Sequence, residues 1–327
     1  MKIALKFAQT NSGATTWMNN LITALNQEGI QTSTEIYKLT NNFKPATPHP
    51  SPNCDLIQTD ITGFRYKTNK PLAVVEYHLI TDPLIWKYYS FSQKIFNQIL
   101  HYWELKTLKQ ADVIISISRY TQKKLTELLG FDSVVIYPGI NTNLFMPLSS
   151  QIHNKPFQLL FVGNPSKRKG ADLLPIIMQK LGPGYLLRYT SGLNKNPYPG
   201  LNQTNTISLG KLNLKQLISE YQRCDALLFP SRLEGFCFAV AEAMACSKPI
   251  VCSNCSSLPE LVINQKGGFL CKSEDVDDFV DKIQLLANKP ALVKKMGIFN
   301  HQRIINSFSL PKMALQFIKL YENTIYK

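Results

Sequence analysis

Residues 230–245, PSRLEGFCFAVAEAMA, hold the pattern from which the fold of this chain can be derived. The four apolar residues before them, 226–229, predict a buried strand. Proline ends this strand, Gly235 gives the next turn conformational freedom, and the alanine-rich residues that follow favour a helix. One carboxylate, Glu234, lies in the loop, and a second, Glu242, lies about two turns along the helix. Loops at the carboxyl ends of parallel strands bind ligands, so we interpret this loop as a binding site; a surface turn with two solvated glutamates is the alternative.

The same alternation of strand and helix runs along the chain in two series. We expect strands at residues 2–7, 34–37, 72–77, 111–118 and 134–137, and then at 157–162, 185–189, 207–209, 226–229 and 249–252. A polar connection at residues 140–156 separates the series, so we predict an α/β protein with two doubly wound, Rossmann-like domains that contain parallel sheets. The predicted domains are residues 1–145 and 155–327, and the last helix is a candidate to pack back on the first domain.

The composition is that of a folded globular protein. The 327 residues suffice for two domains, and contents of 44% hydrophobic and 18% charged residues argue against disorder. The longest apolar runs are shorter than a membrane-spanning helix requires. Residues 1–7 are interrupted by Lys6 and lack the core of a signal peptide, so we expect a cytoplasmic protein.

The net charge of +14 is concentrated in the second half of the chain. Residues 1–150 carry 14 basic against 10 acidic side chains, and residues 151–327 carry 22 against 12. Such an excess favours an anionic partner: a phosphorylated ligand, a membrane surface or nucleic acid. Nucleic acid is the least supported of these partners, because charge alone points to it.

Residues 84–109 combine seven aromatic side chains with lysines. An interfacial membrane helix has this composition, and so has a helix that faces a protein core. Because the basic residues are sparse, we favour the core-facing helix. A peripheral contact with an anionic membrane is left open.

Seven cysteines, an odd number without regular spacing, argue against a disulfide framework. Cys252 and Cys255, with Cys246 and Cys271 nearby, could form a zinc site. Zinc ribbons usually pair two short spacings and this chain has one, so we favour thiols that pack as small hydrophobic groups.

A cluster of cations follows the first strand of the second series. Lys167, Arg168 and Lys169 precede Gly170 at the start of a predicted helix. Cations and free helix N–H groups together suit a diphosphate, whereas a solvated basic face is the alternative.

Hydroxyl-binding groups follow the next strands of the same domain. Glu234 and Glu242 offer acceptors for the hydroxyls of a sugar ring and a ribose, and Ser256, Ser257 and Glu260 come after the next strand. Acceptors for hydroxyls beside cations for phosphate indicate a nucleotide-sugar site.

The first domain offers two candidate residues. Gly13 lies in a polar turn between a strand and a helix, which suits phosphate, although an ordinary tight turn is an equal alternative. His78 follows the strand at residues 72–77, at the end of the sheet where ligands bind, and a structural histidine is the equal alternative.

The motif around residues 230–245 resembles glycosyltransferase family 4. The resemblance rests on Glu234-Gly235-Phe236 and Glu242-Ala243-Met244-Ala245, and it continues in residues 248–251 and 256–260. Shorter matches lie at residues 111–112, 116–119, 137–141, 161–163 and 169–170. The resemblance covers most of the chain, is dense in residues 157–270 and is thin before residue 110. It implies the two-domain GT-B fold, with parallel sheets facing a cleft, and a retaining reaction without metal or other cofactor.

The resemblance also implies roles for individual residues. Glu234, Lys169 and His78 correspond to catalytic positions: Glu234 contacts the donor hexose, Lys169 holds the diphosphate and His78 lies near the acceptor. The implied donor-binding residues are Gly13, Arg168, Gly235, Phe236, Cys237, Glu242, Ser257 and Glu260.

An Asp-x-Asp pattern, by which many sugar-transfer enzymes hold a metal, occurs at Asp275 and Asp277. It follows Ser273 at the start of a predicted helix, where acids satisfy free N–H groups and the helix dipole. We therefore favour a helix cap and expect no metal site.

Four positions depart from the family pattern. Asn164 stands where many members have arginine, Ser12 stands where a second glycine is usual, and Cys237 and Ser247 replace common glycines. Cys237 alters the wall near the sugar, so the identity of the donor stays open.

We therefore expect a retaining, metal-independent transferase that moves a hexose from a nucleoside-diphosphate sugar to a hydroxyl of an unidentified glycan, lipid or small molecule. The alternative is a catalytically silent GT-B module that binds a glycan or a protein partner. The presence of Lys169, Glu234 and Glu242 together favours the enzyme.

Overall fold

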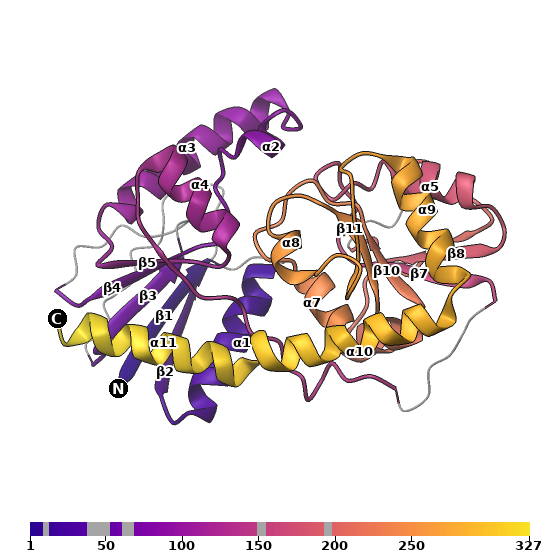
Figure 1. Cartoon of the computed structure of the whole chain (residues 1–327). Coiled ribbons are helices and arrows are strands. Elements are labelled where there is room, and N and C mark those ends of the chain that lie inside the picture. The colour runs from indigo at the N-terminus through magenta and orange to yellow at the C-terminus, as the bar shows by residue number, and fades with distance from the viewer. Residues whose placement is uncertain (9–12, 38–52, 61–68, 149–154, 193–197) are drawn as a thin grey trace. The chain divides into compact units, whose positions relative to one another are not determined.

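The computed structural model describes residues 1–8, 13–37, 53–60, 69–148, 155–192 and 198–327. The chain divides into two compact units (Figure 1). Unit 1 contains residues 1–139 and 308–327, and unit 2 contains residues 140–307. Within the described residues, each unit contains one sheet of six parallel strands.

Unit 1 has its sheet in the order β2-β1-β3-β4-β5-β6. Its strands are β1 (Lys2–Ala8), β2 (Gln31–Tyr37), β3 (Leu56–Asp60), β4 (Leu72–Glu76), β5 (Val113–Ser116) and β6 (Val134–Val135). Its helices are α1 (Gly13–Gln27), α2 (Pro83–Trp86), α3 (Phe91–Leu108), α4 (Arg119–Leu129) and α11 (Leu310–Ile325).

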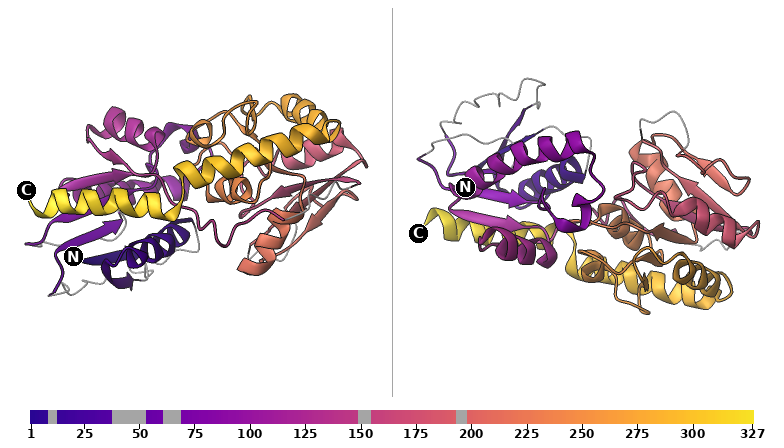
Figure 2. Two further views of the ribbon diagram at one scale, coloured as in Figure 1. Left: turned by 60° about the horizontal axis from the view of Figure 1, so that its bottom comes forward. Right: turned by 90° about the horizontal axis from the view of Figure 1, so that it is seen from above.

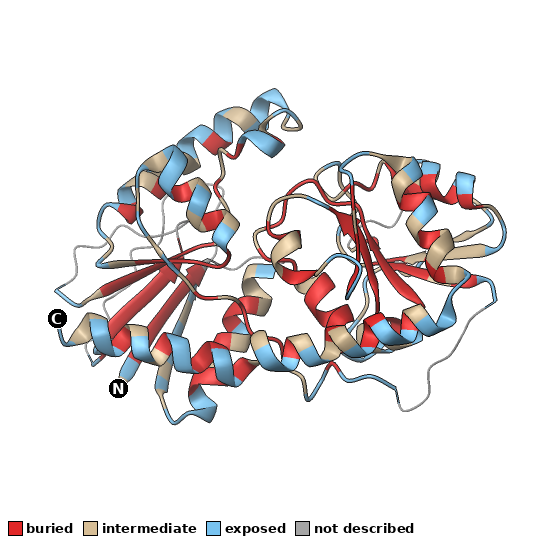
Figure 3. Cartoon of the chain, in the orientation of Figure 1, coloured by how far each residue is buried: buried red, intermediate tan, exposed pale blue. Residues whose placement is uncertain are grey.

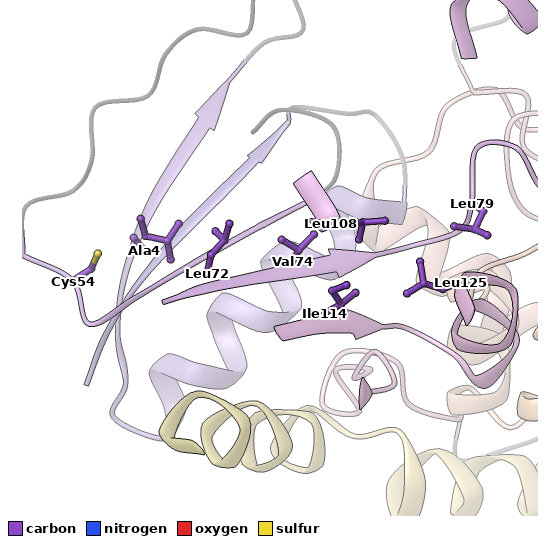
Figure 4. Packing of buried hydrophobic residues seen from close by; sticks show 9 residues of the cluster. Ala4, Cys54, Leu72, Val74, Leu79, Leu108, Ile114 and Leu125 are labelled. Atoms are coloured by element: carbon purple, nitrogen blue, oxygen red, sulfur yellow. The ribbon is translucent and has the colours of Figure 1, made fainter. Parts of the chain in front are cut away.

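Helices cover both faces of this sheet, because the crossovers from β1 and from β4 run in opposite directions along it. On one face, Trp17 of α1 packs edge-on against Phe7 of β1 and Phe317 of α11, with ring centroids 5.6 and 5.9 Å apart. The other face carries the cluster drawn in Figure 4, in which strand residues meet helices α3 and α4. Its members are Ala4, Cys54, Ile57, Leu72, Val74, Leu79, Leu108, Ile114 and Leu125.

The last helix, α11, packs in unit 1. The predicted boundaries count it with residues 155–327, and the same prediction names it as a candidate to pack back on the first domain. Its Tyr321 hydroxyl donates a hydrogen bond to Gln58 Oε1 in β3 over 2.5 Å. The start of α11 presses on Gly139, where a Cβ atom would lie 2.9 Å from the Cα of Leu310. Figure 2 shows α11, in yellow, alongside the strands of unit 1.

Unit 2 has its sheet in the order β12-β11-β10-β7-β8-β9. Its strands are β7 (Phe157–Phe161), β8 (Tyr185–Tyr189), β9 (Thr206–Ser208), β10 (Ala226–Phe229), β11 (Ile250–Ser253) and β12 (Gly268–Cys271). Its helices are α5 (Leu174–Leu181), α6 (Leu214–Arg223), α7 (Phe238–Ala245), α8 (Leu258–Leu261), α9 (Val276–Ala287) and α10 (Pro290–Ser307). Helices α6 and α7 pack together, as do α5 and α9, and α10 packs against α7 and α9.

The predicted fold class, two doubly wound domains with parallel sheets, is confirmed. The central strands are buried and the helices expose one side, as expected for parallel sheets covered on both faces (Figure 3). Among the described residues, the helices are too short or too polar for any of them to traverse a lipid bilayer.

The strand orders locate the switch point of each sheet, where the crossover connections leave in opposite directions across the sheet. In unit 2 this point lies between β7 and β10, and in unit 1 it lies between β1 and β3. Ligands of open α/β sheets bind beside such a switch point, at the carboxyl ends of the strands. The corresponding loops of unit 1, including Ser12 of the predicted glycine turn, fall on residues 9–12 and 61–68, outside the described residues. The corresponding loops of unit 2, residues 162–173 and 230–237, lie within the described residues.

Candidate functional site

The loops that follow β7 and β10 lie side by side in unit 2. The two strands pair in parallel, with Leu159 opposite Ala226. At their carboxyl ends the rings of Phe161 and Phe229 stack, with centroids 5.7 Å apart. Side chains from residues 162–173 and 230–237 can therefore meet, although the two ranges lie at least 57 residues apart in sequence.

The carboxylate of Glu234 is the centre of this meeting point, and it is buried. Its Oε1 accepts a hydrogen bond from the Ser231 hydroxyl over 2.8 Å. The same oxygen lies 3.4 Å from Nη1 of Arg168 and 3.9 Å from Nζ of Lys169. The structure thus joins three predicted site residues, Arg168, Lys169 and Glu234, which we call the cation–glutamate cluster.

Close backbone packing holds Lys169 in place. Its ammonium group lies 5.1 Å from the ring centroid of Phe229, within cation–π range. A Cβ atom on Gly163 would approach this ammonium to 2.8 Å. Gly170 has a φ of 67°, and a Cβ there would lie 1.9 Å from the carbonyl oxygen of Pro230. Only glycine therefore allows the two loops to approach this closely.

Arg232 ties these loops together and was not among the predicted site residues. Its guanidinium donates to both carboxylate oxygens of Asp172 over 2.7 and 2.9 Å, and to Glu274 over 2.8 Å. It also donates to the backbone carbonyl of Lys167. One buried side chain thereby fixes three loops. The acids lie 60 and 42 residues away in sequence, so no local pattern points to this pairing.

Glu242 is a buried carboxyl on α7, eight residues after Glu234. The positive charge of Lys169 acts on it. The Tyr221 hydroxyl of α6 donates a hydrogen bond to its Oε2 over 2.8 Å. Burial raises the pKa of Glu242 to about 7, although the Tyr221 hydrogen bond and the charge of Lys169 act to lower it. Tyr221 was not predicted, because a tyrosine on an amphipathic helix has no distinguishing sequence signal.

The residues between Glu234 and α7 form a buried wall. Phe236 packs edge-on against Phe238 with ring centroids 5.5 Å apart, and Gly235 is half-buried. Cys237 is buried in the left-handed conformation, with a φ of 81°. Burial raises the pKa of its thiol well above the ordinary value, so the thiol packs as a neutral group.

The two serines after β11 hold the backbone of Glu234. Its N–H donates to Ser256 Oγ, and the Ser257 hydroxyl donates to its carbonyl oxygen, both over 2.9 Å. Glu260 lies in the short helix α8, where its carbonyl oxygen accepts a hydrogen bond from Arg303 over 2.7 Å. The side chain of Glu260 is half-buried.

Gly13 and His78, the other predicted residues, lie in unit 1. Gly13 is the exposed first residue of α1. His78 follows β4, and its backbone N–H donates to Glu76 Oε1 over 3.1 Å. Burial and the neighbouring Glu104 raise the pKa of Glu76 well above the ordinary value. His78 is therefore placed beside a buried carboxyl pair that sequence reasoning did not identify.

The Asp-x-Asp pattern lies at a helix start, as predicted, with Asp275 and not Ser273 as the cap. Asp275 Oδ1 accepts a hydrogen bond from the N–H of Asp278 at the start of α9. Asp277 pairs with Lys180 over 2.5 Å. The seven cysteines are free thiols, and Cys255 donates to the carbonyl oxygen of Ser231. Over the described ranges, no three His, Cys, Asp or Glu side chains are grouped as metal ligands.

Comparisons with known proteins agree with this arrangement. A model of glycosyl transferases group 1 matches residues 199–303, and a model of Glycosyltransferase Family 4 matches residues 53–144. An uncharacterized glycosyltransferase of Methanocaldococcus jannaschii is 30% identical over 215 residues, which cover 65% of this chain and 60% of that protein. The chain thus spans about three fifths of this curated relative.

Two solved structures share the fold over almost the entire chain. Sucrose-phosphate synthase from Thermosynechococcus elongatus has a TM-score of 0.80 and 19% identity, with 99% of this chain and 98% of that chain covered. Anabaena HepE in complex with UDP-glucose has a TM-score of 0.76 and 17% identity, with 99% and 100% covered.

Proposed function

The chain belongs to the glycosyltransferases of family 4, and on this premise we propose that it is a retaining enzyme that moves a hexose from a nucleoside-diphosphate sugar to a hydroxyl acceptor. The observation that carries the proposal is the cation–glutamate cluster at the switch point of unit 2. Its cations suit a diphosphate and its carboxylate suits sugar hydroxyls.

Each member of the site has a part in the proposed reaction. The bond between the anomeric carbon and the donor phosphate oxygen breaks, and its electron pair leaves with the diphosphate. Lys169 and Arg168 stabilise the negative charge that develops there, because they are held in place before the reaction begins. Glu234 orients the hexose. The acceptor oxygen then bonds to the anomeric carbon from the same face, and its proton passes to the departing phosphate.

Glu242 is proposed to bind the ribose of the donor. Its carboxyl is held by Tyr221, so it can accept hydrogen bonds from the two ribose hydroxyls without reorganising. The half-buried Gly235 and the wall of Phe236 and Cys237 are proposed to flank the sugar. A uridine nucleotide is the first donor to test, because HepE was crystallised with UDP-glucose.

The proposal also gives roles to residues outside the cation–glutamate cluster. We propose that Gly13 contributes to phosphate binding, and that His78 serves the acceptor hydroxyl. Ser257 supports the donor site through the backbone of Glu234, and Glu260 of α8 is proposed to contact the donor. Two side-chain cations already lie beside the proposed diphosphate site, so transfer is expected to need no metal and to persist in EDTA.

The test combines donor screening with two variants. UDP-, GDP- and ADP-sugars are screened by thermal shift, because a ligand that binds the native state raises the melting temperature. The donor that binds is then followed by hydrolysis and transfer. Glu234→Ala and Lys169→Ala are expected to lower turnover by about a hundredfold to a thousandfold while the protein stays folded. Glu322→Ala and Lys211→Ala, at exposed positions, are the matched controls.

The competing function is a catalytically silent module. It would bind a nucleotide tightly and turn over none of the donors in the screen. Full turnover in both Glu234→Ala and Lys169→Ala would also refute the proposed site, even if the protein proved to be a transferase.

A further inference from the structure

Helix α3 of unit 1 contains many exposed residues (Figure 3), and several of them are large apolar side chains that form a row. The exposed fractions are 81% for Phe91, 48% for Ile95, 43% for Ile99 and 59% for Tyr102. Spacings of four, four and three residues place these side chains on one side of the helix. We call these four residues the α3 stripe.

The opposite side of α3 packs against unit 1, and three of its four buried residues are polar, the fourth being Leu108. Asn97, Glu104 and Thr107 are buried there, and Glu104 pairs with His101 over 2.6 Å. A helix that packs on a globular core normally turns its apolar side inward. In α3 this orientation is reversed, so the α3 stripe contributes little to the stability of unit 1. An exposed apolar row of this kind marks an interaction surface.

The charges around the stripe all have the same sign. Within residues 83–110, all of which the structure describes, the exposed or half-buried charged groups are lysines, and the single acid, Glu104, is buried. The lysines are Lys87, Lys94, Lys106 and Lys109. Lys106 lies 5.5 Å from the ring centroid of Trp103, and Lys87 lies 4.8 Å from that of Tyr88. These long side chains thus run along aromatic surface and end in a charge.

We propose that the α3 stripe docks on the surface of an anionic lipid membrane. The 18 residues of α3 form a rod of about 27 Å that lies in the plane of the headgroups. Its apolar side chains enter the boundary between headgroups and acyl chains, and the lysines contact lipid phosphates. This surface lies outside the proposed donor site and does not depend on the enzyme being active.

The charge pattern favours a membrane over a second copy of the chain. A twofold dimer through α3 would bring the same lysines towards one another, and no exposed carboxylate of residues 83–110 would offset the repulsion. An anionic bilayer offers the opposite charge and an apolar layer together. Docking through one short helix is reversible and weakens as salt screens the lysines.

Flotation with lipid vesicles tests the proposal. The wild-type protein is expected to bind vesicles of phosphatidylcholine with about one third phosphatidylglycerol, and to bind pure phosphatidylcholine much more weakly. The variant Phe91→Gln/Ile95→Gln/Ile99→Gln is expected to lose more than about tenfold in affinity. Lys94→Gln and Lys106→Gln are each expected to lose about fivefold, and the wild type is expected to release at high salt.

Matched controls separate the stripe from general surface hydrophobicity. Ile298→Gln and Leu315→Gln replace apolar residues of similar exposure on other helices, and both are expected to bind vesicles as the wild type does. Melting temperatures confirm that every variant is folded. The proposal is overturned if the wild type ignores anionic vesicles, or if the triple variant binds them unchanged. It is also overturned if the wild type self-associates in solution and the triple variant becomes monomeric.

Discussion

At the scale of single residues, the burial of the Glu242 carboxyl lowers the stability of the folded state at neutral pH. Its carboxyl is buried on α7 and, with a pKa of about 7, stays protonated at pH values where the unfolded chain has already released its proton. The pKa is raised from 4.5, so the stability of unit 2 falls as pH rises from about 4.5 to 7. A residue that lowers stability at neutral pH fits a role in ligand binding.

Glu242→Gln is therefore expected to stabilise the ligand-free protein, because glutamine is neutral and can still accept the Tyr221 hydrogen bond. The gain in the free energy of unfolding should be about 3 kcal/mol at pH 8 and about 1 kcal/mol at pH 5. Urea denaturation at the two pH values measures it. Glu322→Gln, at an exposed position, is the control. A gain that is the same at both pH values would contradict this account.

Sequence reasoning named the members of the cation–glutamate cluster but not the residues that hold the cluster in place. Glu234, Lys169 and Arg168 were predicted because each follows a strand, and the structure brings them together. Arg232 and Tyr221 were missed, because their partners lie on distant segments that only the fold brings near.

The backbone conformation shows what two departures from the family pattern cost the protein. Cys237 and Ser247 replace common glycines, and their φ angles are 81° and 59°. Both residues keep the left-handed conformation that glycine adopts without strain. The loop geometry is thus retained at a cost of about 1 to 2 kcal/mol for each residue.

At the scale of elements, the prediction for residues 84–109 was wrong in its orientation. Alternation of apolar and polar residues shows that a helix is amphipathic, but it does not show which side packs. In α3 the side that packs carries three buried polar residues besides Leu108. The favoured core-facing placement of the aromatic residues is corrected by the exposure of Phe91 and Tyr102.

Two strands were absent from the predicted set for different reasons. β3 contains Gln58, Thr59 and Asp60, and so lacks the apolar run expected of a central strand. Its polar side chains are buried because partners such as Tyr321 reach them from elsewhere in the chain. β12 is short and begins at Gly268, which a sequence pattern marks as a turn.

Helix α11 is expected to contribute much of the stability of unit 1. Phe317 is fully buried against Trp17, so Phe317→Ala should lower the free energy of unfolding by about 3 to 5 kcal/mol. Denaturation followed by tryptophan fluorescence measures the loss. Leu315→Ala, at an exposed position of the same helix, should change stability by less than about 0.5 kcal/mol. Equal losses in the two variants would show that α11 is not anchored through Phe317.

At the scale of the whole molecule, the division into two units gives them separate spectroscopic signals. The three tryptophans, Trp17, Trp86 and Trp103, all belong to unit 1, so unit 2 has none. Tryptophan fluorescence therefore reports unit 1, whereas circular dichroism reports both units.

The donor nucleotide is expected to act mainly on unit 2, where the cation–glutamate cluster lies. At about one hundred times its dissociation constant it should add roughly 2.7 kcal/mol to the stability of the unit that binds it. Thermal unfolding should then show a higher midpoint by circular dichroism and a smaller shift by tryptophan fluorescence. If circular dichroism and tryptophan fluorescence give the same midpoint as each other, both without and with nucleotide, the two units unfold as one.

The placement of α11 also sets an order of events during synthesis. Unit 1 is interrupted by the 168 residues of unit 2, and its last helix is made after all of them. At about 5 to 20 residues per second, the ribosome needs roughly 8 to 34 s to bridge this interval. During that time the Trp17 side of the nascent sheet lacks its cover, whereas unit 2 is continuous and can fold as soon as it emerges. The half of the protein that is translated first is therefore the half that is completed last, and its exposed apolar face is a natural client for chaperones.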